Sequence, residues 1–171
     1  RADEHRNILV GELNHRAKNS LAMVRAIASQ TLATATSLEA AKLAFDARLG
    51  ALARGHDLLT HGNWVGTDLD SVIKATVEPH GGGDRFRIEG PVVKLTPATA
   101  LTFTMALHEL CTNAAKYGAL SKENGHVTVV WQVTGESTER LLRLKWTEKD
   151  GPPVMPPMRK GFGSRLIEKA L

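Results

Sequence analysis

The sequence predicts an α+β chain in which an N-terminal antiparallel helical hairpin is followed by an α/β sandwich, with helices on one face of a mixed β-sheet. Apolar residues recur every three or four positions over residues 2–59, which is the spacing of amphipathic helices. Further along, apolar and polar residues alternate in short segments, as they do in half-buried strands. A long helix, residues 97–117, separates two pairs of such segments. This order of helices and strands is typical of a two-layer fold.

Composition and charge narrow the class of protein. The chain has 171 residues, 42% of them hydrophobic, and no apolar run approaches the length that crosses a membrane. Its charged start, RADEHRNILV, lacks the apolar centre of a signal peptide. The one cysteine, Cys111, excludes an internal disulfide and suits a reducing compartment, so we expect a soluble, cytoplasmic chain. The net charge of +4 comes from scattered basic residues, and nucleic acid is not an expected partner.

Two helices are expected in the first domain, which we place at residues 1–62. The first runs from about residue 2 to 32, with an apolar stripe formed by Leu9, Leu13, Ala17, Leu21, Val24 and Ala28. Thr36-Ser37-Leu38-Glu39 has the form of a capping box and starts a second helix that continues to about Leu59. The short link at residues 34–36 predicts an antiparallel hairpin. Such a hairpin has too little core alone, so its apolar stripe should meet another surface.

The second domain is placed at residues 63–171. Thr67 or Asp68 can cap a short helix that ends near residue 77. HGGGDR, residues 80–85, indicates a connecting turn and not a phosphate-binding loop, because no Gly-Lys-Ser/Thr follows it. Strands are expected around residues 86–88, 93–95, 127–133 and 142–146, the last two of them antiparallel. Prolines exclude regular structure over residues 152–160, and the Gly161-Phe162-Gly163-Ser164 turn opens a final helix.

The helix at residues 97–117 is the most clearly marked element. Thr96 can cap its first free amides, Pro97 occupies the first helical position, where its missing N–H costs nothing, and Gly118 ends it. One side carries the apolar residues that should face the sheet: Phe103, Leu107, Leu110 and Ala114.

A second, polar stripe on this helix combines Glu109, Asn113 and Lys116. A site for phosphates and Mg²⁺ would use all three, since it needs hard oxygen ligands, a cation and a carboxylate that handles protons. A solvated helix face with polar pairs four residues apart explains the same spacing. The spacing alone leaves both interpretations open.

Four segments resemble the motifs of one family of signalling enzymes. HELCTNAAKYGALS, residues 108–121, resembles the N-box of the Bergerat-type ATPase and histidine kinase superfamily. Its leading His108, together with Trp146-Thr147-Glu148 further on, resembles the variant found in the HWE histidine kinases. ELNHRAKNSLA, residues 12–22, resembles the phosphoacceptor box of that subgroup, and GFGSRLIE, residues 161–168, its glycine box. The four occur in the family's order and span nearly the whole chain.

The resemblance implies roles for individual residues, with ATP and Mg²⁺ as cofactors. His15 would receive the phosphoryl group, Glu109 would assist it, and His108 would tune the site from the N-box. Asn113 would bind Mg²⁺ through its amide oxygen. Adenine would be read by Glu148, with Asp150 as a rival acceptor. The other nucleotide-contacting residues would be Lys116, Tyr117, Gly151, Gly161, Gly163 and Ser164.

The implied function is the catalytic core of a two-component sensor histidine kinase that phosphorylates His15 and passes the group to a response-regulator aspartate. A homodimer through the hairpin is expected, with a monomer as the alternative, and the sensor domain lies outside this chain. The family's ATP-binding domain usually continues into a further strand, which this chain is expected to lack. Two other functions remain open: a pseudo-kinase or phosphotransfer module that docks regulators, and a Bergerat-type ATPase that forms no phosphohistidine.

Overall fold

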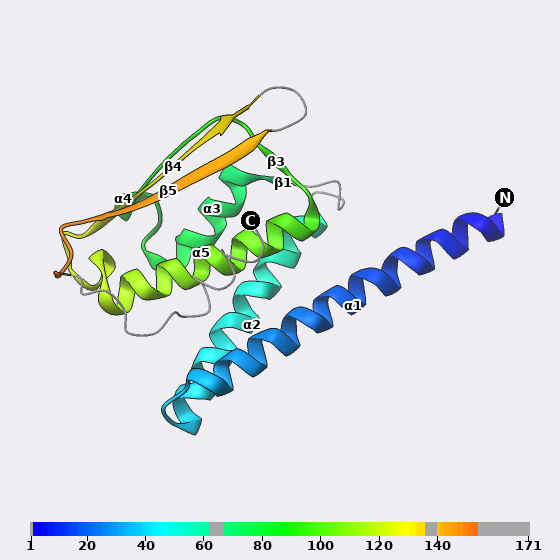
Figure 1. The fold of residues 1–171 in the computed structure, drawn as a ribbon, viewed down its shortest axis with the longest axis horizontal. Helices are drawn as coiled ribbons and strands as arrows, with labels where there is room; N and C mark the ends of the chain where they lie inside the picture. The colour runs from blue at the N-terminus through cyan, green and yellow to red at the C-terminus, as the bar shows by residue number, and fades with distance from the viewer. Residues whose placement is uncertain (1, 62–66, 136–139, 154–171) are drawn as a thin grey trace. The chain divides into compact units, whose positions relative to one another are not determined.

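The computed structural model describes residues 2–61, 67–135 and 140–153 (Figure 1). Its contacts divide the chain into two compact units, Arg1–Leu49 and Gly50–Leu171, and this division falls within the second helix. The expected boundary at residues 62–63 falls outside the described residues. The boundary between functional domains at residues 62–63 therefore stays a prediction.

The two N-terminal helices are present. Helix α1 spans Ala2–Thr34 and helix α2 spans Leu38–His61. The helix cap differs in detail from the expected capping box, because the Ala40 amide donates to Ser37 Oγ at 3.1 Å and the cap therefore lies one residue after Thr36. Within the first unit, Arg48 Nη1 donates to the buried Thr31 Oγ1 at 2.8 Å, which ties the middle of α2 to the end of α1.

The second unit contains the short elements and the sheet. After α2 come β1 (Thr67–Asp68), α3 (Leu69–Val77), the 3₁₀ helix η1 (Glu78–His80), α4 (Gly82–Arg85), β2 (Phe86–Glu89), β3 (Lys94–Leu95), α5 (Pro97–Tyr117), the 3₁₀ helix η2 (Ala119–Ser121), β4 (His126–Thr134) and β5 (Leu141–Lys149).

Three details of this unit differ from the sequence-based expectation. The glycine-rich segment at residues 80–85 is not a plain turn, because it contains the single helical turn α4. Asp68 stands at the N-cap of α3 but its side chain makes no capping bond there; it forms an ion pair with Lys94 at 3.1 Å. Strand β1 was not expected, since two residues carry no periodic signal.

The main sheet is mixed, with strand order β2-β4-β5. Strand β2 runs parallel to β4, with Phe86 opposite Val127, and β4 runs antiparallel to β5, with Val129 opposite Trp146 and Val127 opposite Glu148. The short strands β1 and β3 pair antiparallel in a separate ladder. Because side chains alternate along a strand, this register places Trp146 and Glu148 on the same face as Phe86, Val127 and Val129.

Helices α3 and α5 cover that one face of the sheet (Figure 1). The core between the two layers is built from buried apolar residues of both, including Leu69, Val72, Ile73, Phe103, Met105, Leu107, Phe86, Val127, Val129 and Trp131. The expected fold class, α+β with helices on one face of a mixed sheet, is confirmed.

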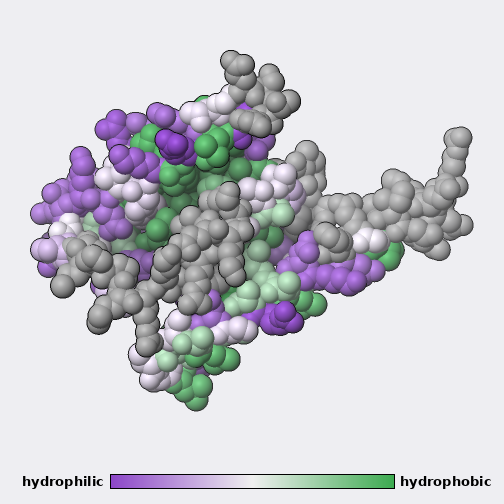
Figure 2. All heavy atoms as spheres, viewed as in Figure 1, coloured by the Kyte–Doolittle hydropathy of each residue, from purple (hydrophilic) through white to green (hydrophobic). Residues whose placement is uncertain are grey.

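Helix α5 has the expected bounds, Pro97–Tyr117, and the expected cap, because the Thr99 amide donates to Thr96 Oγ1 at 3.3 Å. Between α5 and the edge strand β5 lies an apolar groove of about 460 Å³, lined on the helix by Phe103, Ala106, Leu107 and Leu110 and on the strand by residues 141–144 and Trp146. Apolar side chains gather in this hollow in Figure 2. None of the described helices is long and apolar enough to cross a membrane.

Candidate functional site

The C-terminal half of α5 carries five of the predicted site residues, and they fall into two environments. Asn113, Lys116 and Tyr117 are exposed at the last turns of the helix, where Tyr117 has 69% of its surface exposed. His108 and Glu109 are buried, each with 6% of its surface exposed. The exposed group offers an amide oxygen, an ammonium group and a phenol to a ligand, which is a donor set suited to phosphate and Mg²⁺.

Glu148 connects strand β5 to the end of this helix. Trp146 and Glu148 lie two residues apart on one strand, so their side chains project from the same face. Trp146 Nε1 donates to Glu148 Oε1 at 3.0 Å, and the Ala119 backbone amide donates to Glu148 Oε2 at 2.8 Å. The two predicted motifs, residues 108–121 and 146–148, therefore meet through one carboxylate.

The close approach of these motifs requires glycine at position 118. A Cβ atom at Gly118 would lie 1.9 Å from Glu148 Oε2, well inside van der Waals contact. Gly118 has a φ of −113°, so the requirement comes from space and not from backbone conformation. Gly151 also faces this corner, because a Cβ there would lie 2.7 Å from the Ala119 Cα.

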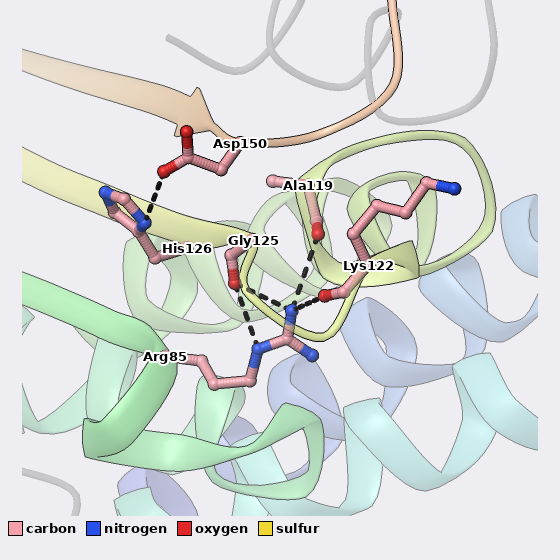
Figure 3. Close-up of polar contacts among 6 residues, drawn as sticks. All are labelled: Arg85, Ala119, Lys122, Gly125, His126 and Asp150. Carbon is pink, nitrogen blue, oxygen red and sulfur yellow. Dashed lines mark hydrogen bonds and ion pairs between the residues drawn. The ribbon is translucent and has the colours of Figure 1, made fainter.

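Asp150, the rival adenine acceptor, lies at the same end of the sheet. Its carboxylate is 3.3 Å from His126 Nδ1, the first residue of β4 (Figure 3). The β4–β5 register pairs His126 with Lys149, which brings the next residue, Asp150, beside the imidazole. Asp150 has a φ of 57°, a conformation that aspartate tolerates better than most residues. Two carboxylates thus lie close to the residues that follow α5.

His108 belongs to a different environment, in the packing between α5 and η1. Its ring lies 6.2 Å from that of His80, centroid to centroid, with 53° between the planes. Burial lowers the pKa of His80 below its ordinary value, and the charge of Arg54 lowers it further. This places a neutral imidazole beside His108 near neutral pH.

Comparison with known proteins agrees with the motifs. Residues 12–92 match the family model of the HWE histidine kinases. The whole chain is 39% identical over 173 residues to the blue-light-activated histidine kinase of Brucella anthropi, and 36% identical to that of Brucella ovis. The chain belongs to the HWE histidine kinases. It spans 35% of the length of each of these two relatives.

A solved structure also resembles this chain. The Erythrobacter litoralis EL346 blue-light activated histidine kinase aligns over 87% of this chain and 54% of its own, with 19% identity and a TM-score of 0.49.

Some predicted residues of this HWE kinase chain belong to the first unit or fall outside the described residues. His15 lies in α1, in the first unit, and its side chain is outside the described part of the structure. Gly161, Gly163 and Ser164 also fall outside the described residues. Within residues 2–61, 67–135 and 140–153, no cluster of three or more His, Cys, Asp or Glu side chains could hold a metal ion.

The apolar groove between α5 and β5 is lined by none of the predicted site residues that the structure describes. Its lining of Phe, Leu and Trp side chains is suited to contact with another apolar surface and provides few polar groups for a charged nucleotide. The corner formed by the end of α5 and the end of β5 is therefore the better candidate in this HWE kinase chain.

Sequence reasoning missed two residues of that corner. His126 belongs to none of the predicted motifs, yet it pairs with Asp150. Arg85 belongs to none of the predicted motifs, yet its guanidinium lies against the chain that follows α5. For His126 the sequence offered one signal, its position at the start of β4 opposite the end of β5. For Arg85 there was none, because its partners lie 34 or more residues away.

Proposed function

We propose that this chain is the catalytic core of a sensor histidine kinase, which moves the γ-phosphoryl group of ATP to His15 and then to an aspartate of a response regulator. Membership of the HWE family supports the reaction class. One observation carries the assignment of the site: the 2.8 Å hydrogen bond from the Ala119 amide to Glu148, which joins the N-box helix to the Trp-x-Glu strand.

On the adenine side, we assign the exocyclic amino group to Glu148, with Asp150 as the rival acceptor. Each carboxylate oxygen has two lone-pair directions, so Glu148 can accept from a base as well as from Ala119 and Trp146. Gly151 carries no side chain that would keep the base away from the backbone. A charged acceptor beside bare main chain suits the recognition of an amino group on a flat ring.

On the phosphate side, we assign Lys116 to the phosphate oxygens and Asn113 to Mg²⁺. Both are exposed, one turn apart on α5, so they can reach the same ligand. Mg²⁺ prefers oxygen ligands and commonly takes one or two from protein and the rest from phosphate and water, which a single amide oxygen fits. The metal would neutralise charge on the β- and γ-phosphate oxygens. Tyr117 adjoins this pair, and Gly161, Gly163 and Ser164 are assigned to the phosphates on the family resemblance.

At the acceptor, a neutral imidazole nitrogen of His15 would attack the γ-phosphorus. The new P–N bond forms as the bond from phosphorus to the bridging oxygen breaks, and ADP leaves with the electron pair. The proton of the attacking imidazole has to leave, and we assign its removal to Glu109. His108, buried beside the half-buried His80, would act on the site by orienting α5 and not by touching the nucleotide.

The partners follow from the same proposal. The phosphohistidine would be read by the receiver domain of a response regulator. We assign homodimer formation to the hairpin, because six leucines on α1 and α2 are exposed: Leu13, Leu21, Leu32, Leu38, Leu43 and Leu49. In a dimer these side chains could form the core of a four-helix bundle.

The test is retention of acid-labile label on the protein after incubation with γ-labelled ATP. The wild-type chain is expected to retain label, and His15→Ala is expected to bind ATP normally without retaining it. Release of labelled inorganic phosphate without retained label would identify an ATPase. Absence of both, in a folded chain, would identify a docking module and contradict the kinase assignment.

A further inference from the structure

Arg85 makes more hydrogen bonds to distant backbone than any other side chain whose bonds the structure describes. It is the last residue of α4, directly before β2, and the parallel β2–β4 register places it beside the start of β4. Arg85 Nε donates to the Gly125 carbonyl at 3.0 Å, and one terminal nitrogen, Nη2, donates to the same oxygen at 2.7 Å (Figure 3).

The same guanidinium reaches three more carbonyl groups. Nη1 donates to the Leu120 carbonyl at 3.3 Å, and Nη2 donates to the Ala119 carbonyl at 3.4 Å and to the Lys122 carbonyl. Two of these oxygens already accept bonds within the turn, from the Lys122 amide at 3.1 Å and the Gly125 amide at 3.2 Å. Arg85 therefore fills the inside of the turn at residues 118–125, which we call the post-helix turn.

The post-helix turn leads to both carboxylates of the candidate site. The Ala119 amide, at one end of the turn, holds Glu148 at 2.8 Å. Gly125, at the other end, is followed directly by His126, whose imidazole lies 3.3 Å from Asp150. A displacement of the turn would thus move the groups that hold Glu148 and Asp150 without touching either carboxylate.

We propose that Arg85 is a positioning residue for adenine recognition: it fixes the post-helix turn, and the turn fixes Glu148 and Asp150. This inference rests on the proposed function, since it presumes that one of these carboxylates accepts a hydrogen bond from adenine. No motif of the chain assigns Arg85 a role, and its guanidinium contacts neither carboxylate in the bonds that the structure describes.

Arginine is suited to holding several carbonyl groups of the post-helix turn at once. A guanidinium presents five N–H donors in a fixed plane and can serve several carbonyl groups at once. A lysine ammonium has three donors on a single atom and cannot span acceptors spread along a turn. Arg85→Lys keeps the charge and loses the geometry, so it separates the two contributions.

The test compares the binding of ATP with that of ITP, which carries an oxygen in place of the adenine amino group. In the full chain, ATP is expected to bind more tightly than ITP, because only ATP donates to a carboxylate at that position. Arg85→Lys is expected to reduce this preference by about tenfold, the value of one charge-assisted hydrogen bond, mainly through weaker ATP binding. A general loss of folded protein would lower both affinities together and leave their ratio unchanged.

The matched control is Arg87→Lys. Arg87 lies two residues further along β2 and pairs with Glu89 on the exposed surface at 2.8 Å, away from the post-helix turn. It should leave the ATP-to-ITP ratio within about twofold of the wild type. Hydrogen exchange gives a readout without nucleotide: the Ala119 amide should exchange faster in Arg85→Lys and at the wild-type rate in Arg87→Lys.

If Arg85→Lys gives no cooperative thermal transition, Ser121→Ala loosens the same turn more mildly, because it removes the 2.7 Å bond from Ser121 Oγ to the Gly118 carbonyl. The same direction of change in the nucleotide ratio is then expected. If the wild-type preference for ATP over ITP is unchanged in both variants, Arg85 has no positioning role, and the proposed function still stands. A wild-type chain that binds neither nucleotide would overturn the proposed function and this inference with it.

Discussion

At the residue scale, the polar side chains of α5 differ mainly in how far they are buried. His108, Glu109 and Cys111 lie in the packed interior, whereas Asn113 and Lys116, further along the same helix, face solvent. A buried group acts through protonation and packing, while an exposed group meets ligand and metal directly. The following three predictions belong to single side chains.

Asn113→Ala is expected to weaken the binding of Mg·ATP at least about tenfold and to leave metal-free ATP nearly unaffected, because its amide oxygen is assigned to the metal. The adenine contact would survive in this variant. Calorimetric titration with and without Mg²⁺ measures the difference. Equal weakening under both conditions would remove Asn113 from the metal site.

Cys111 is expected to be unreactive in the folded chain. Burial raises the pKa of its thiol to about 12 from an ordinary 9.0, with the Glu148 charge acting in the same direction, and its side chain has 0% of its surface exposed. At pH 8 the thiolate fraction falls roughly a thousandfold. Titration with a thiol-specific chromogenic reagent should detect no reaction in the native chain and one thiol in urea. Fast native labelling would contradict the burial.

His80 is expected to make the second unit less stable in acid. Its folded pKa lies below the ordinary 6.5, so the unfolded chain binds the proton more readily. The stabilisation is complete above pH 6.5 and is lost as the pH falls from there through the lower folded value. Arg54 and His108 are the ionisable groups known to face it. His80→Gln should flatten the pH dependence of urea unfolding over this range, and parallel curves for the two proteins would contradict the prediction.

At the scale of elements, the connection from α5 to β4 has the strictest geometry in the described part of the second unit. Gly125 is buried, and a Cβ atom there would lie 1.8 Å from the Ala119 carbonyl oxygen and 2.6 Å from its carbon. Both atoms belong to the backbone, so neither can turn aside as a flexible side chain would. The turn that joins the helix to the sheet is therefore constrained by contact between its own backbone atoms as well as by the hydrogen bonds of Arg85.

Gly125→Ala is expected to lower the free energy of unfolding by about 2 kcal/mol or more, because the backbone of the turn must move to admit the methyl group. Gly83→Ala is the matched control: it lies within α4, and no atom would come within 4 Å of its Cβ. That change should be neutral or stabilising by up to about 1 kcal/mol. Urea denaturation of both variants measures this, and equal stabilities would show that the turn adapts.

At the scale of the whole molecule, the hairpin and the second unit present different surfaces. The core of the second unit is buried between its helices and its sheet, whereas the hairpin exposes large leucine side chains to solvent. Leu13 and Leu21, eight residues apart on α1, are 65% and 69% exposed. A surface of this kind favours association with a second apolar surface.

The chain is therefore expected to sediment as a dimer at micromolar concentration, and Leu13→Glu with Leu21→Glu should weaken the dimer by more than about tenfold, since each buried charge would lack a partner. Val92→Glu, at a position 84% exposed in the second unit, is the control and should leave the dimer intact. Sedimentation velocity over a range of concentrations measures the dimer fraction of the wild type and of both variants. A wild-type monomer at every concentration would contradict assembly through the hairpin.

The sequence by itself determined the elements whose signals are local. Helix α5 begins at Pro97 and ends at Tyr117 as expected, since a cap, a first-turn proline and a following glycine all lie within or beside the helix. The two long helices and the antiparallel pair β4–β5 were also predicted, because their periodicity repeats over many residues. The motifs that identify the family are likewise short runs of sequence.

Only the tertiary structure decided how these elements meet. The parallel pairing of β2 with β4 and the bonds of Arg85 to the post-helix turn join residues 34 to 41 positions apart, and the burial of Glu109 also depends on packing. No local pattern specifies such contacts, because they depend on sheet register and on which side chains the packed layers exclude from water. Gly118 illustrates both: its sequence position marked the helix end, and only the structure shows that a Cβ atom there would meet the Glu148 carboxylate.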